Sequence, residues 1–187
     1  MINYLVYNTL TSTIHALVMF FLGILNVPQW LFLDGIKLSI AYNIYDMYIM
    51  PKSNIRNQMY LHHIILISLS SYVILNPTPN IMKLISLGYM TEITTPFLNI
   101  AWYFNAKKNR TDLETKIFYA SSLITFLLYL PFRIMLTTYI SYLMMNYNSF
   151  IKYPVFAITG LNYFWYYKMC LKARKLFFKV DMKTSNI

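Results

Sequence analysis

The sequence predicts an all-α, polytopic membrane protein in which about six transmembrane helices form a ring around a polar-lined interior. Hydrophobic residues occupy 58% of the 187 positions and charged residues only 12%, whereas soluble domains have roughly 45–50% and about 25%. The hydrophobic residues are concentrated in long runs, as in membrane-spanning helices. Each run also carries one stripe of polar residues, which indicates a shared interior. The length suits a single domain, residues 1–187, with a short basic tail at about 172–187.

The apolar runs predict six spans, at residues 4–25, 31–50, 61–75, 81–104, 117–145 and 154–170. The first run is too long for the core of a signal peptide and has no basic residue before it, so we expect a retained helix. The second follows a break at residues 27–30 and stops before Pro51. The third is short for about 30 Å of hydrocarbon at about 1.5 Å per residue. Its two histidines are therefore expected at headgroup depth or on a tilted helix.

Turns and loops separate the remaining spans. Residues 52–58 read as a polar loop, and residues 76–80 as a turn between the third and fourth spans. A charged loop at 105–116 precedes the fifth span, which we expect to be kinked or interrupted at Pro131. The single cysteine, Cys170, excludes an internal disulfide.

The basic residues predict the orientation. Six spans place twelve of the sixteen Lys and Arg residues on the same side as the N-terminus, which the positive-inside rule makes cytoplasmic. The formal net charge of +10 would suggest nucleic acid in a soluble protein. Because most of the basic residues here lie in loops and the tail, we expect anionic lipid headgroups as their partners and no nucleic acid.

Three charged residues lie well inside predicted spans, Asp46, Glu92 and Arg133, whereas Asp34 and Lys37 are at the entrance of the second span. A charge at the bilayer centre costs about 2.5–3.5 kcal/mol on insertion scales, and such residues usually face a protein interior or a wet cavity. The simplest structural interpretation is that Arg133 neutralises Asp46 or Glu92. The alternative is a functional cavity, and the convergence of several titratable and polar groups favours it.

Further polar residues extend this predicted interior. His15 shares a face of the first span with two other polar residues, and Asn162 lies in the sixth. In the fourth span the spacing of Gly88, Glu92, Thr95 and Asn99 places them on one helical face. The predicted lining of the polar interior therefore comprises His15, Asp46, Asn99, Arg133 and Asn162.

The adjacent histidines His62 and His63 are the strongest candidates for chemistry. Neighbouring residues point about 100° apart on a helix, whereas a helical zinc site uses histidines four residues apart, so we expect no metal. One histidine could face the cavity as acid, base or nucleophile while the other orients it or meets headgroups. Glu92 could hold the required tautomer or take a proton itself. The candidate catalytic residues are thus His62, His63 and Glu92.

Motifs along the chain resemble those of the TLC domain family, which includes ceramide synthases, the translocating-chain-associating membrane protein and other TLC-domain-containing proteins. The matching segments, in family order, are residues 12–16 (STIHA), 45–46 (YD), 62–63 (HH), 91–99 (TEITTPFLN), 133–134 (RI) and 162–167 (NYFWYY). The resemblance implies a ring of six helices, an endoplasmic-reticulum-type membrane and a lipid ligand. The abundance of Ile, Asn, Lys, Tyr and Met and the scarcity of Gly and Ala indicate an AT-rich genome, such as that of a protist or a large DNA virus. If the source is a virus, the membrane would be that of the host.

The resemblance also implies what the site could do. In ceramide synthases a histidine pair and two later aspartates form the acyl-transfer site, and His62 and His63 match that pair. Tyr89 stands about where the first aspartate is expected, and Glu92 replaces the second. The chain therefore resembles more closely the non-synthase members, which are associated with lipid handling and membrane composition.

Three functions follow as alternatives. The first is lipid binding, handling or sensing, with a sphingolipid or fatty-acyl ligand and no cofactor. The second is a ceramide-synthase-like acyltransferase that uses His62, His63 and acyl-CoA. The third is a structural or translocon-associated membrane factor. The sequence leaves the oligomeric state open.

Overall fold

The computed structural model describes residues 2–25, 27–50, 56–145, 147 and 150–177. These residues are helical, with turns between the helices and no strand. The elements are α1 (Ile2–Ile24), α2 (Gln29–Ile49), α3 (Arg56–Leu75), α4 (Pro79–Met90), the 3₁₀ segment η1 (Thr91–Thr94), α5 (Thr95–Ala106), α6 (Asp112–Tyr129), the π-helical segment η2 (Leu130–Met135), α7 (Leu136–Met144) and α8 (Lys152–Phe177). The all-α prediction is confirmed.

Two of the helical rods are interrupted without being broken. The rod α4–η1–α5 tightens into 3₁₀ geometry just before Pro96, and α6–η2–α7 widens into π geometry around Pro131. Proline lacks an amide proton and its ring displaces the carbonyl four residues earlier, so the backbone must depart from α geometry there. The predicted interruption at Pro131 is confirmed; the one near Pro96 was not foreseen.

The loop between α5 and α6 has its own local stabilisation. The Thr111 hydroxyl accepts a hydrogen bond from the Glu114 amide, and the Glu114 carboxylate accepts one from the Thr111 amide, which completes a capping box at the start of α6. Lys107 donates to the same carboxylate, and this hydrogen bond raises the pKa of the Lys107 ammonium. The charged loop thereby fixes where α6 begins.

Two helices extend beyond the apolar spans predicted for them. The third helix begins at Arg56 and not at Leu61, so the last three residues of the predicted polar loop form its first turn; residues 51–55 lie outside the described residues. The last helix continues to Phe177, so the start of the predicted tail is helical, and residues 178–187 lie outside the description. In both places polar residues that form helices well extend the hydrogen-bonded backbone beyond the apolar run.

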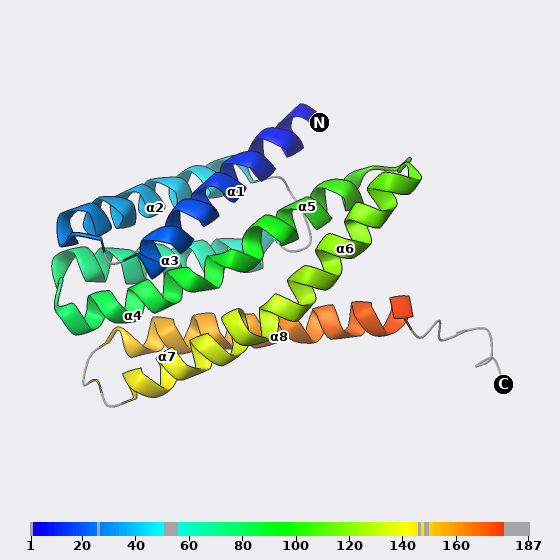
Figure 1. Ribbon diagram of the computed structural model, residues 1–187. Coiled ribbons are helices and arrows are strands. Elements are labelled where there is room, and N and C mark those ends of the chain that lie inside the picture. Colours follow the sequence, from blue (N-terminus) through cyan, green and yellow to red (C-terminus); the bar gives the residue numbers. More distant parts are fainter. Residues whose placement is uncertain (1, 26, 51–55, 146, 148–149, 178–187) are drawn as a thin grey trace.

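The six rods of the described chain lie alongside one another, with α4–α5 between α1 and α6–α7 (Figure 1). Successive contacts join α1 to α2, α2 to α3, α3 to α8, α8 to α7, α7 to α4, and α4 back to α1. The apolar core fills the end of the bundle near the α3–α4 turn; its members include Phe32, Ile36, Leu69, Val73, Ile140 and Met144.

The crossing of α1 and α4 is especially close. The Ser86 hydroxyl donates to the Gly23 carbonyl oxygen at 2.6 Å. A β-carbon added at Gly23 would lie 2.7 Å from the Ser86 carbonyl oxygen, so only glycine permits this approach.

Two described helices, Arg56–Leu75 and Asp112–Met145, are long and apolar enough by themselves to cross a membrane. Asn8–Ile24 is apolar but shorter.

Candidate functional site

A cavity of about 90 Å³ lies between the helices. Five of the eight predicted interior residues line it, each from a different rod: His15, His62, Glu92, Arg133 and Asn162. The rest of the wall is mainly apolar and includes Leu66, Leu69, Leu84, Ile85, Ile140 and Val155. A buried water needs only about 10–15 Å³ on this kind of measure, so the cavity can hold several waters or part of a larger ligand.

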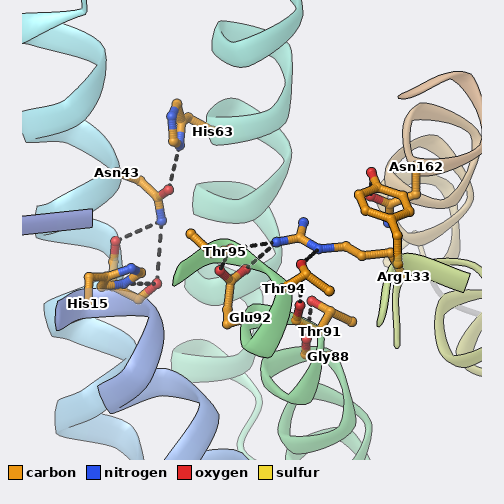
Figure 2. Close-up of polar contacts among 12 residues, drawn as sticks. His15, Asn43, His63, Gly88, Thr91, Glu92, Thr94, Thr95, Arg133 and Asn162 are labelled. Atoms are coloured by element: carbon orange, nitrogen blue, oxygen red, sulfur yellow. Dashed lines mark hydrogen bonds and ion pairs between the residues drawn. The ribbon is translucent and has the colours of Figure 1, made fainter. Parts of the chain in front are cut away.

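Arg133, on the π-helical segment η2, is held by groups from η1 and α5. Its Nε donates to the Thr94 hydroxyl at 3.0 Å, and its Nη2 donates to the Thr95 hydroxyl at 2.9 Å. The same Nη2 lies 3.5 Å from Oε1 of Glu92. Thr95 in turn donates to Oε2 of Glu92 at 2.7 Å. We call these four residues the arginine network (Figure 2).

The arginine network joins the two places where the helices depart from α geometry. Because η1 faces η2, the hydroxyls of Thr94 and Thr95 at the 3₁₀ turn contact the guanidinium of Arg133 on the π-helical turn. Of the two carboxylates expected to neutralise Arg133, the structure pairs it with Glu92 and not with Asp46. The pair is neutral overall, so it adds no net charge to the cavity.

His63 belongs to a second group of contacts, between α2 and α3. The amide nitrogen of Asn43 donates to the Ser39 carbonyl oxygen at 2.7 Å, so the amide oxygen faces His63 and accepts from its Nδ1 at 2.6 Å. The opposite ring nitrogen, Nε2, lies 2.8 Å from Oδ2 of Asp46.

His15 connects this group to the cavity. Its Nε2 lies 3.3 Å from the Ser39 hydroxyl, and its ring stacks on Tyr42 at a centroid distance of 3.9 Å. We call the connected set His15, Ser39, Asn43, His63 and Asp46 the histidine network. Figure 2 shows the contacts of His15, Asn43 and His63. Ser39 and Asn43 were not predicted as site residues. Their spacing with Asp46, four and then three residues, would have indicated one shared face of α2.

His62 differs from its neighbour. It lines the cavity and is 8% exposed, yet its Nδ1 has no hydrogen-bond partner in the described part of the chain. Its ring packs against Trp165 at 5.3 Å between centroids, and the Trp165 indole donates to Gln58 at 3.2 Å. A buried ring nitrogen without a partner, on a residue that lines a cavity, calls for an explanation, and a bound ligand would supply one.

The remaining predicted residues lie in two places. Asn162 lines the cavity and accepts a hydrogen bond from the Tyr129 hydroxyl at 3.3 Å. Asn99 does not line it; its amide donates to the Thr13 hydroxyl at 3.0 Å and so joins α5 to α1. Glu92, in η1, contacts Arg133 instead, so the two residues have different partners.

The geometry limits the chemistry that the cavity can perform. His62 can donate or accept a proton there, whereas His63 and Asp46 lie behind the wall and can act only through other groups. Glu92 is engaged by Arg133 and Thr95. Among the described residues, no three His, Cys, Asp or Glu side chains come together as a metal site would need.

Comparison with known proteins agrees with the motifs. The TLC domain matches residues 5–171. A TLC domain-containing protein of Acanthamoeba polyphaga mimivirus is 31% identical over 158 residues, which cover 78% of this chain and 74% of the viral protein. No solved structure matches the chain.

Proposed function

This chain belongs to the TLC domain family, and from that premise we propose that it is a multi-pass membrane protein that binds a lipid between its helices and affects membrane lipid composition. Residues 1–187 would form one domain, with six spans in a ring and both termini in the cytoplasm. The closed series of helix contacts supports the ring, and the distribution of Lys and Arg supports the orientation. An endoplasmic-reticulum-type membrane, a host membrane for a viral protein, fits the family and the viral relative.

The unpaired His62 nitrogen beside an apolar wall carries this proposal. A lipid offers a polar group for His62 and a hydrocarbon chain for Leu66, Leu69 and Ile85. The arginine network is satisfied internally, so the ligand need not supply a counter-charge. Since the cavity is smaller than the roughly 300–1,000 Å³ of a drug-sized site, the rest of the lipid would extend between helices.

Filling the cavity tests lipid binding. Leu66→Trp places a larger side chain against the cavity, and Leu75→Trp on the same helix is the control because Leu75 is 78% exposed. We expect mass spectrometry of lipids retained by the purified protein to show at least a tenfold loss for Leu66→Trp and little change for Leu75→Trp. Equal retention by the two variants would contradict binding in this cavity.

The orientation has a separate test. Asn109 begins a glycosylation sequon that ends at Thr111, in the loop expected to be cytoplasmic. We expect Asn109 to remain unmodified in a eukaryotic cell, whereas a glycan there would invert the topology and place the histidine pair on the lumenal side.

The second candidate function is acyl transfer from acyl-CoA to a long-chain amine, and the arrangement of the histidine pair supports it. His62 faces the cavity as a base or nucleophile would, while Asn43 and Asp46 hold His63 behind it. Tyr89 lines the same cavity as His62. General acid–base help is worth about 10²–10⁴-fold in rate, so a histidine that serves this role could not be removed without loss of product.

Incubation of purified protein with labelled acyl-CoA and amine distinguishes the two candidates. Acylated product from wild type that disappears in His62→Ala would establish the enzyme. We expect no such product, because neither Tyr89 nor the engaged Glu92 provides the free carboxylate of the synthase site.

A further inference from the structure

A charged pair lies on the outer face of α2. The Lys37 ammonium is 2.8 Å from Oδ1 of Asp34, and the two side chains are 60% and 58% exposed. The 21 residues of α2 span about 31 Å at about 1.5 Å per residue, close to the thickness of the hydrocarbon layer. Asp34 and Lys37 therefore lie roughly 7 and 12 Å inside the start of the helix.

Charges at this depth usually face a protein interior or another protein group, because hydrocarbon does not solvate them. Asp46, Glu92 and Arg133 follow that rule and are buried or largely buried in the bundle. Asp34 and Lys37 face outward. Lysine can extend its ammonium toward the headgroups, but the short aspartate side chain cannot. The pair is therefore unexplained if this face meets only lipid.

The pair belongs to a regular exposed stripe along α2. Residues at 34, 38, 41, 45 and 48 are all exposed, and their spacing of four, three, four and three is that of helices that pack side by side. Ala41, in the middle, has a small side chain that permits close approach. An open groove continues the stripe at its far end; it is lined by Ile44, Met47, Tyr48, Tyr60 and Ile64.

We infer that this stripe is an interface with a second copy of the chain, with α2 packed against α2 across a two-fold axis along the membrane normal. A two-fold interface brings residue i of one copy to residue j of the other, and j to i. Asp34 of each copy then faces Lys37 of its neighbour, and four charges alternate in sign. The exposed Tyr48, 89% accessible, meets the groove of the second copy.

Charge complementarity favours a second copy over an anionic lipid. A lipid phosphate would satisfy Lys37 but would repel Asp34, whereas an identical chain offers both signs at nearly the same depth. The inference rests on the proposed membrane location of α2, but not on lipid binding in the cavity. Lipid retention and self-association can therefore fail separately.

Charge exchange tests the interface, with differently tagged full-length chains co-expressed and reconstituted in bilayer nanodiscs. We expect wild-type chains to capture one another, and Asp34→Lys or Lys37→Asp chains to lose at least tenfold in self-capture because each variant presents one sign only. Asp34→Lys chains mixed with Lys37→Asp chains should recover capture. Monomeric wild type, undiminished self-capture of either variant, or no recovery in the mixture would overturn the inference.

Cross-linking gives a second test that leaves the charges intact. In a Cys170→Ser background, Ala41→Cys should form an oxidised dimer in membranes. Leu127→Cys on α6, 61% exposed to the surroundings, is the control and should remain monomeric. Equal cross-linking at both positions, or none at Ala41→Cys, would contradict an α2–α2 contact.

Discussion

The two polar networks inside the bundle differ in how their members are satisfied. In the arginine network the charged groups of Arg133 and Glu92 contact each other and the hydroxyls of Thr94 and Thr95, and the Thr94 hydroxyl also donates to the Thr91 carbonyl oxygen. The histidine network is a chain instead, which runs from Asp46, behind the wall, to His15 at the cavity. His62 belongs to neither network, although it lies next to His63 in sequence and close to it in space.

This difference indicates which polar residues stabilise the fold and which are available to a ligand. Paired opposite charges are what a membrane bundle needs to tolerate buried groups, so the arginine network is explained by structure alone. Stability does not explain the nitrogen of His62, a residue of the cavity wall, that has no partner among the described residues. Substitutions that separate the networks should therefore have effects of different size and kind.

The largest effect is expected in the arginine network. Arg133→Leu leaves Glu92 as an uncompensated charge, and breaking a buried pair in this way costs about 3–5 kcal/mol. We expect little monodisperse protein in detergent and a large loss in the free energy of unfolding. Adding Glu92→Gln should recover part of the loss, whereas adding Asp46→Asn should not, because Asp46 contacts His63. Rescue by Asp46→Asn would show that the pairing is assigned incorrectly.

A smaller effect is expected in the histidine network. Asn43→Leu removes the acceptor of the His63 Nδ1 proton and the donor to the Ser39 carbonyl. A buried polar group left without a partner costs about 1–3 kcal/mol, so the free energy of unfolding should fall by that amount. Ser68→Ala is the control: its hydroxyl bonds to its own helix at an exposed position, and a change within about 0.5 kcal/mol is expected. Equal losses in the free energy of unfolding for Asn43→Leu and Ser68→Ala would contradict a stabilising role for the histidine network.

The sequence predicted the helices and most of the inward-facing polar residues because both depend on local composition. Apolar runs locate spans, and a charge inside a span must face inward. It did not predict the 3₁₀ segment in the fourth rod. Glu92 and Asn99 are seven residues apart, with η1 beginning just before Glu92, and they have different partners: Glu92 contacts Arg133 on η2, and Asn99 contacts Thr13 on α1.

The ends of the helices and the pairing of the buried charges could not be predicted from local composition either. The hydropathy of residues 56–58 is that of a loop, yet their backbone forms the first turn of α3 and places both histidines more than a turn inside the helix. Which carboxylate pairs with Arg133 depends on the contact between η1 and η2, and no spacing in the chain encodes it. Asn43 could have been found from its spacing to Asp46, but a single asparagine in an apolar span carries little information by itself.

The smallest stability effect, and the most informative, is expected at His62. His62→Phe keeps a ring against Trp165 and strands no partner, because Nδ1 has none among the described residues. The free energy of unfolding should change by less than about 1 kcal/mol. His63→Phe keeps a ring as well but deprives both Asn43 and Asp46 of their contact, and should cost about 1–3 kcal/mol.

Lipid retention should show the opposite order. If His62 supplies one hydrogen bond to a bound lipid, its loss removes roughly 0.5–1.5 kcal/mol, which is at most about tenfold in affinity. His63 lies behind the wall, so a His63→Phe chain that still folds should retain lipid nearly as wild type does. Both quantities can be measured on the same preparations, by chemical unfolding in detergent and by mass spectrometry of retained lipids. If His62→Phe destabilises the protein as much as His63→Phe while lipid retention is unchanged, then His62 is a structural residue, and the distinction between the two histidines is lost.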